Sequence, residues 1–190
     1  MHKGSKQIVI TGGIGSGKSY VVRQVASLGW ELIEADQIGH AVLRSDGAAF
    51  LEVAHRWPEV VCEGEIQRSE LANLVFADQG ELEELETITH PYIQAEIFRR
   101  LRLTDRRVVV ELPVEGLLAE WPRVVVDAPR DLRIERLAAR GMDPDDAFRR
   151  MEAQPSRARW VAAADFVFNN GGDVPFSDEF ERLKRWLETE

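Results

Sequence analysis

The feature that most constrains this chain is a glycine-rich segment between an apolar run and a helical pattern. Residues 12–19 read Gly-Gly-Ile-Gly-Ser-Gly-Lys-Ser and fit the pattern G-x-x-x-x-G-K-S. The run 7–11 has the composition of a β-strand, and apolar residues recur behind the segment at helical spacing, at Val21, Val25 and Leu28. Strand, glycine loop and helix in this order predict a phosphate-binding loop.

In such a loop the backbone N–H groups and the N-terminus of the following helix receive phosphate oxygens. Lys18 would reach the β- and γ-phosphates, and the Ser19 hydroxyl would ligate Mg²⁺. We therefore expect a nucleoside triphosphate as ligand, with Mg²⁺ as cofactor. The loop residues expected to bind it are Gly13, Ile14, Gly15, Ser16, Gly17, Lys18 and Ser19.

The composition narrows the class of protein. The 190 residues carry 24 basic and 33 acidic side chains, a net charge of −9. This balance argues against a general surface for nucleic acid or anionic membrane, because both require a positive footprint. The length fits one domain, 1–190.

The single cysteine, Cys62, excludes an intramolecular disulfide and suits a reducing compartment. We expect it to be buried as a small apolar residue. The first residues show no apolar signal-peptide region, and no apolar stretch approaches the length of a membrane span. We expect a cytoplasmic protein.

Apolar runs alternate with helical patterns, which predicts an α/β fold with a parallel sheet. The expected strands are 6–11, 30–34, 107–112, 123–127 and 164–168. The mostly helical stretch between the second and third strands predicts an acceptor-binding insertion over about 45–104. Pro91 lies within this stretch and should start a new helix or kink the existing one. The core would then comprise 6–35, 105–135 and 160–190, with a lid over about 136–159.

Two carboxylates, Glu34 and Asp36, end the second expected strand. Ligands bind off the carboxyl ends of strands in open parallel sheets, so these residues should face the glycine loop. Alternation along the strand points Glu34 and Asp36 the same way. Asp36 would orient or deprotonate an acceptor hydroxyl, or either residue would hold Mg²⁺ through water. Alternatively, Asp36 only caps the next helix.

Arginines concentrate between Arg130 and Arg159. Arg133, Arg136 and Arg140 are spaced i, i+3, i+7 and should share one helix face. Phosphoryl transfer needs cations near the developing charge, often on a lid that closes over both substrates. The alternative for each arginine is a solvated helix face paired with acidic neighbours.

Together these segments resemble the dephospho-coenzyme A kinase family. The resemblance rests on Thr11 to Ser19, on Glu34-Ala35-Asp36 for D-A-D, on Arg68-Ser69-Glu70-Leu71 with Val75-Phe76, on His90-Pro91-Tyr92-Ile93 for H-P-x-I, on Arg136 to Arg140, on Gln154, and on Ala164-Asp165 with Asn170 and Gly172 for A-D-x-x-x-x-N-x-G. It implies transfer of the ATP γ-phosphate to the ribose 3′-hydroxyl of dephospho-coenzyme A. It also implies a P-loop kinase fold: a five-stranded parallel sheet with a helical acceptor domain and a helical lid.

The resemblance also implies roles for residues. Asp36 falls on the catalytic aspartate and Arg140 on the lid arginine, and both would act with Lys18. Asn170 and Gly172 fall in the adenine-side loop, and Tyr20 replaces a threonine near the α-phosphate. Residues on the acceptor side are Glu34, Arg68, His90 and Pro113. From the residues alone, the isolated His90 is more often structural.

Two alternatives stay open. The segment 111–117 keeps only Pro113 of the family's P-L-L-x-E, which leaves a kinase of another small acceptor, such as a nucleoside or nucleotide. The other alternative is a nucleotide-binding regulatory module without catalysis. A GTPase is set aside, because Asp36 to Gly39 matches D-x-x-G but the chain has no N-K-x-D.

Overall fold

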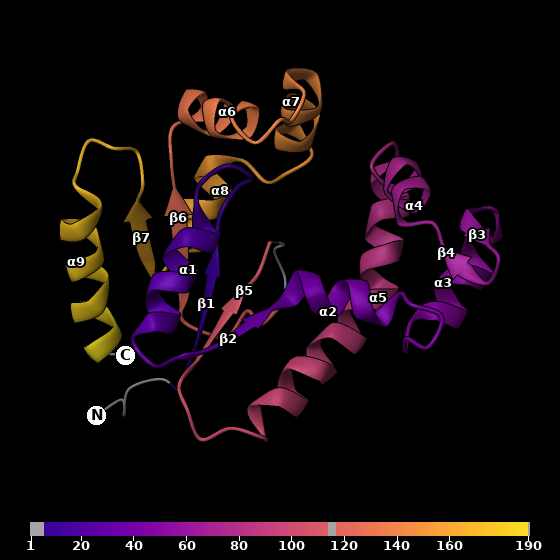
Figure 1. Ribbon diagram of the computed structural model, residues 1–190, viewed down its shortest axis with the longest axis horizontal. Helices are drawn as coiled ribbons and strands as arrows, with labels where there is room; N and C mark the ends of the chain where they lie inside the picture. The colour runs from indigo at the N-terminus through magenta and orange to yellow at the C-terminus, as the bar shows by residue number, and fades with distance from the viewer. Residues whose placement is uncertain (1–5, 114–116, 190) are drawn as a thin grey trace. The chain divides into compact units, whose positions relative to one another are not determined.

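The chain divides into two structural units, Met1–Ile33 with Arg106–Glu190 and Glu34–Asp105. The computed structural model describes residues 6–113 and 117–189 (Figure 1).

Valine-rich runs form the centre of a five-stranded sheet in the first unit, in the order β2-β5-β1-β6-β7. The strands are β1 (Gln7–Thr11), β2 (Glu31–Glu34), β5 (Val108–Glu111), β6 (Arg123–Asp127) and β7 (Phe166–Asn169). The central strand β1 pairs in parallel with β5 and β6, and β6 pairs in parallel with β7. The predicted α/β fold with a five-stranded parallel sheet is confirmed.

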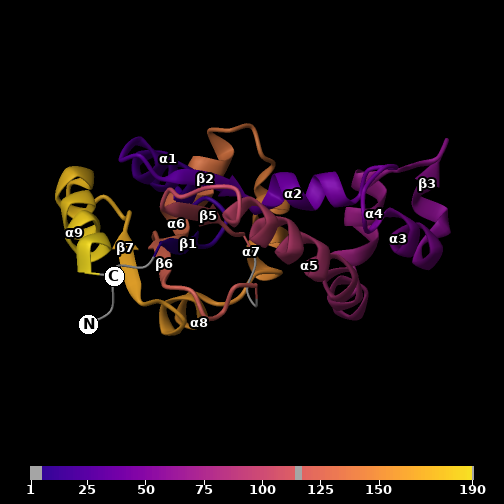
Figure 2. The same ribbon diagram turned by 90° about the horizontal axis from the view of Figure 1, so that it is seen from below.

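Helices flank the sheet of this unit. They are α1 (Lys18–Ser27), α6 (Arg130–Ala138), α7 (Pro144–Glu152), α8 (Arg157–Ala162) and α9 (Phe176–Thr189). In two perpendicular views α9 lies beside β7 (Figures 1 and 2). Leu183 of α9 and Phe168 of β7 belong to one core cluster, and both are fully buried.

The prediction that Arg133, Arg136 and Arg140 share one helix face is wrong for Arg140. Helix α6 ends at Ala138, so Arg140 lies beyond it. Gly141 follows in a left-handed conformation with φ +82°, and the Met142 N–H returns to the Leu137 carbonyl at 3.1 Å. Such a C-terminal glycine ends the helix and separates Arg140 from the row of Arg133 and Arg136.

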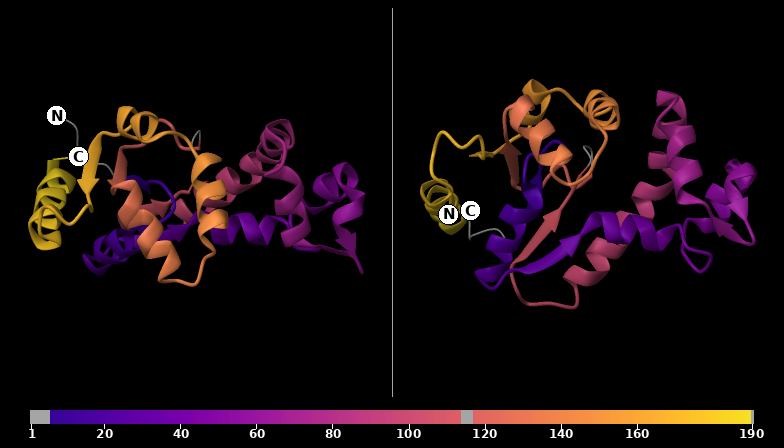
Figure 3. Two further views of the ribbon diagram at one scale, coloured as in Figure 1. Left: turned by 90° about the horizontal axis from the view of Figure 1, so that it is seen from above. Right: turned by 45° about the horizontal axis from the view of Figure 1, so that its top comes forward.

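The second unit is mainly helical (Figure 3). Its elements are α2 (Ala35–Val42), α3 (Phe50–Arg56), a 3₁₀ turn (Pro58–Val60), β3 (Val61–Cys62), β4 (Glu65–Ile66), α4 (Arg68–Val75) and α5 (Gln79–Leu101). Helices α2, α3 and α4 each pack against α5. The short antiparallel hairpin β3–β4 is not predicted by the sequence, and it leaves Cys62 exposed. The expected burial of Cys62 is therefore wrong.

Helix α5 runs through Pro91 without a break, so no new helix starts there. Its ribbon changes direction along its length (Figure 1), as expected of a helix that contains proline. Among the helices that the structure describes, none combines the length and the hydropathy required to cross a bilayer.

We predict that Leu183→Ala lowers the free energy of unfolding by about 2–5 kcal/mol, because it removes a fully buried side chain between α9 and the sheet. Chemical denaturation followed by circular dichroism measures this change. Leu51, which is 79% exposed, provides the control: Leu51→Ala should change stability by less than about 0.5 kcal/mol. Equal effects of the two substitutions would contradict the packing described here.

Candidate functional site

The glycine loop joins β1 to α1 and turns its backbone around a single concavity. Gly17 precedes α1 with φ +94°, a conformation that glycine adopts without strain. The loop closes on itself through the Ser16 N–H, which donates to the Gly13 carbonyl at 3.1 Å. Lys18 begins α1 and is half-buried. This is the strand, loop and helix that the sequence predicts.

Glu111 lies beside the loop, although the sequence pattern alone predicts no role for it. The Ser19 hydroxyl donates to Oε1 of Glu111 at 2.6 Å. Glu111 is the last residue of β5 and lies in register with Ile10 of β1, one residue before that strand ends. The sequence signal for Glu111 is its position directly after a run of valines. Only the pairing of β5 with β1 brings its carboxylate beside Ser19.

Ile14, in the middle of the loop, is held by two side chains distant in sequence. Its N–H donates to Oε1 of Gln154 at 2.8 Å, and its carbonyl accepts from Nε of Arg133 at 2.7 Å. Gln154 lies between α7 and α8, and Arg133 lies on α6. Burial lowers the pKa of the Arg133 guanidinium, and the nearby Asp127 carboxylate opposes this effect.

The carbonyl of Ser16 is held in a similar way. It accepts from Nη1 of Arg136 at 3.1 Å and from the Asn170 side-chain amide at 2.7 Å. Nη2 of Arg136 donates to the Asn170 carbonyl at 2.9 Å. The structure thus brings the predicted residue Asn170 to the loop, together with Arg136.

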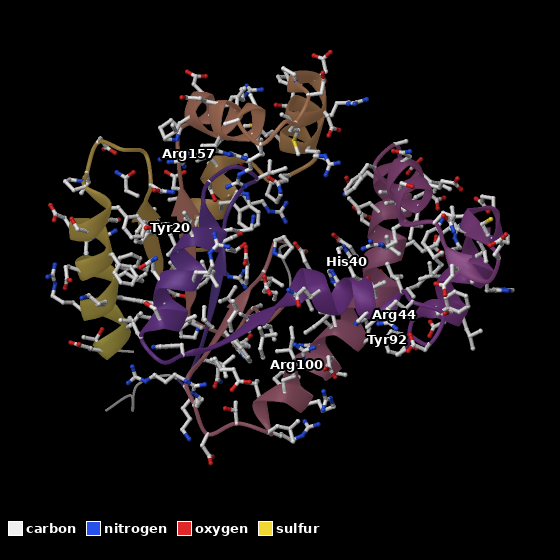
Figure 4. The ribbon with its side chains drawn as sticks, in the orientation of Figure 1. Tyr20, His40, Arg44, Tyr92, Arg100 and Arg157 are labelled. Atoms are coloured by element: carbon white, nitrogen blue, oxygen red, sulfur yellow. The ribbon has the colours of Figure 1, made fainter. Side chains whose placement is uncertain are left out.

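Beside the loop lies a small, partly open cleft, lined in part by Gly13, Ser16, Arg133, Arg157 and Trp160. Nε and Nη2 of Arg157 (labelled in Figure 4) donate to the carboxylate of Asp127 at the end of β6, with contacts from 2.6 to 3.0 Å. The Ser16 hydroxyl and Trp160 Nε1 are buried without a partner among the described groups. The lining thus combines donor groups with the Asp127 carboxylate and the apolar residues Val125, Val126 and Ala128.

Tyr20 points from α1 toward the side of α9 (Figure 4). Its ring meets that of Phe176 edge to face at 4.8 Å and remains 50% exposed. An aromatic side chain thus lies at the position where the resemblance implies threonine. The exposed Arg140 and Gly172 belong to the same unit, and their roles stay predictions.

Asp36 lies in the second unit, exposed in the first turn of α2. Strand β2 ends at Glu34, so the predicted alternation of Glu34 and Asp36 on one strand is wrong. Residues two apart in a helix do not share a face. The capping alternative is also wrong, because Glu34 holds the N-cap position and no side chain caps α2.

The residues predicted for the acceptor are placed as follows. Glu34 accepts a hydrogen bond from Nε2 of Gln37. Arg68 is exposed at the start of α4, and His90 is half-buried on α5. Pro113 follows β5, whereas residues 114–116 of the divergent segment lie outside the described residues. The acceptor role of all four residues stays a prediction.

Ser19 and Glu111 have the chemistry for Mg²⁺, which prefers a few hard oxygen ligands together with substrate phosphates. Outside this pair, the described part of the chain has no cluster of three His, Cys, Asp or Glu residues that could hold a metal.

A family model of known proteins matches most of this chain. This model, described as dephospho-CoA kinase, matches residues 7–175. A dephospho-CoA kinase from Corynebacterium jeikeium is 40% identical over 177 residues, which cover 88% of this chain and 91% of that protein. The crystal structure of TT1252 from Thermus thermophilus superposes with a TM-score of 0.84 at 28% identity and covers 98% of both chains. Dephospho-CoA kinase from Campylobacter jejuni shares the fold, with a TM-score of 0.68, 24% identity, and coverage of 97% of this chain and 98% of that one.

We predict that His90 makes the protein less stable in acid. Burial lowers the pKa of His90, so the unfolded chain binds a proton more readily than the folded one. The contribution of neutral, buried His90 to the free energy of unfolding is complete above the pKa of about 6.5 that histidine has in an unfolded chain. It is lost as the pH falls below that value. Unfolding midpoints between pH 8 and 5 should therefore fall less in His90→Gln than in wild type. The exposed His55, changed to Gln, is the control, and a His90 variant with the wild-type pH profile would refute the prediction.

Proposed function

The chain belongs to the dephospho-CoA kinase family, which phosphorylates dephospho-CoA to CoA with ATP, and from this premise we propose how its own residues perform that reaction. The observation that carries the proposal is the glycine loop with Ser19 and Glu111 hydrogen-bonded at one end. This arrangement supplies amides, a lysine and two oxygen ligands for a triphosphate with its metal.

On the donor side, the loop amides and Lys18 bind the phosphates of ATP. Ser19 and Glu111 would hold Mg²⁺. A cation held there would supply positive charge against the charge that develops on the phosphate oxygens. Asn170 and Gly172 lie toward the adenine of the nucleotide, and Tyr20 lies near its α-phosphate.

On the acceptor side, Asp36 accepts a hydrogen bond from the ribose 3′-hydroxyl and orients it for in-line attack. The support is its position two residues after β2, its exposed carboxylate and its match to the family's catalytic aspartate. Glu34, Arg68, His90 and Pro113 contact the rest of the acceptor. The unit Glu34–Asp105 would then contain the acceptor-binding insertion.

Arg140 closes over the transferring phosphoryl group as part of a lid over about 136–159. Its support is exposure: it lies past the end of α6, while Arg133 and Arg136 are engaged with the loop backbone. Lid closure would exclude water and position both substrates, which is most of what phosphoryl transfer requires. We also place the protein in the cytoplasm, because its exposed free thiol, Cys62, suits a reducing compartment.

ADP release measured with a panel of acceptors tests the substrate. Dephospho-CoA should stimulate release from ATP with Mg²⁺, whereas nucleosides and nucleotides should not. Stimulation by another acceptor alone would favour a different small-molecule kinase. ATP binding without stimulation by any acceptor would favour a regulatory module.

We predict that Asp36→Asn lowers kcat by about 10²–10⁴-fold and leaves ATP affinity unchanged, because the amide no longer accepts the hydroxyl proton. Steady-state kinetics and calorimetric ATP binding measure the two quantities. Asp46→Asn, at an exposed residue of the same unit, is the control. Unchanged turnover in Asp36→Asn would remove this residue from the mechanism.

We predict that Glu111→Gln raises the Mg²⁺ concentration required for half-maximal activity by about tenfold, because a neutral amide is a poorer ligand for a hard cation. Activity titrated with Mg²⁺ at fixed ATP measures this shift. The exposed Glu120, changed to Gln, should not shift the curve. A wild-type curve for Glu111→Gln would contradict the assignment.

A further inference from the structure

The backbone conformation of Gly13 does not explain why glycine occupies this position. Gly12, Gly15 and Gly17 have left-handed φ values, whereas the φ of Gly13 lies outside that region. A Cβ atom built on Gly13 would lie 2.4 Å from Nη2 of Arg133, 2.6 Å from Cζ and 2.9 Å from Nη1. The guanidinium therefore occupies the space that any side chain at position 13 would need.

The Arg133 side chain cannot move out of this space without losing contacts to the loop. Its Nε donates to the Ile14 carbonyl at 2.7 Å, and its side chain is half-buried. Its backbone is also close to the loop, since a Cβ on Gly15 would lie 2.7 Å from the Arg133 carbonyl oxygen. A rotation of the guanidinium away from Gly13 would break a charge-assisted hydrogen bond to the loop.

Gly13 and Arg133 also line the same small cleft beside the loop. Without the guanidinium, the Gly13 side of the loop would face a wider opening. A loop that must hold its amides toward phosphate would then lose a contact that fixes its conformation.

We propose that Arg133 is a positioning residue for phosphoryl transfer, and that position 13 must be glycine because of Arg133 and not because of the nucleotide. The guanidinium fixes the Gly13–Gly15 stretch through the Ile14 carbonyl and thereby presets the loop amides for ATP. This inference rests on the proposed function for its catalytic readout, while the loop conformation itself is tested by nucleotide binding alone.

A double-mutant cycle tests the pair. Gly13→Ala and Arg133→Ala should each weaken ADP binding and lower kcat/KM for ATP by about tenfold, the value of one hydrogen bond to a charged group. In the Arg133→Ala background, Gly13→Ala should cost less than about threefold, because the clash is gone. Arg133→Lys, which lacks the forked head, should also tolerate alanine at position 13.

Two further measurements distinguish a positioning role of Arg133 from a general loss of folded structure. KM for dephospho-CoA should stay within about twofold of wild type in every variant, and melting temperatures report whether each variant is folded. Arg185→Ala, at an exposed arginine of α9, is the matched control and should behave as wild type. ADP binding by calorimetry needs no acceptor, so it remains decisive if the acceptor is misassigned. Equal costs of Gly13→Ala with and without Arg133, or a harmless Gly13→Ala in wild type, would overturn the proposal.

Discussion

The rest of the site depends on which groups donate hydrogen bonds to the carbonyl oxygens of the glycine loop. A loop that turns its N–H groups toward phosphate points several carbonyls away from it, and buried carbonyls need donors. Arg133 provides the donor for Ile14, while Arg136 and Asn170 provide donors for Ser16. Helix α6 and the end of β7 are thereby fixed against the loop.

This arrangement divides the arginines between Arg130 and Arg159 by their contacts. Arg133 and Arg136 hold the loop backbone, and Arg157 binds Asp127 at the end of β6. Arg140 lies beyond the helix and is exposed. Under the proposed function, one compositional cluster would both preorganise the donor site and close it, which is how phosphoryl transfer gains most of its rate.

The fold was predictable because its signals are local. Valine runs buried on both faces indicate parallel strands, and the pattern at 12–19 fixes the turn between β1 and α1. Glu111 was not assigned a role because its contact with Ser19 depends on the register of β5 with β1, which is a nonlocal pairing. The early start of α2 at Ala35 and the exposed hairpin around Cys62 likewise depend on packing within the second unit.

The central claim is that the γ-phosphate of ATP reaches the ribose 3′-hydroxyl of dephospho-CoA. Phosphorus-31 NMR of the purified product of ATP, Mg²⁺ and dephospho-CoA tests it most directly, because it identifies the phosphorylated position. The account predicts one new 3′-phosphomonoester resonance, with its proton coupling to the ribose and in stoichiometric balance with ADP. ADP formed without that resonance, or a phosphate on another hydroxyl, would contradict it.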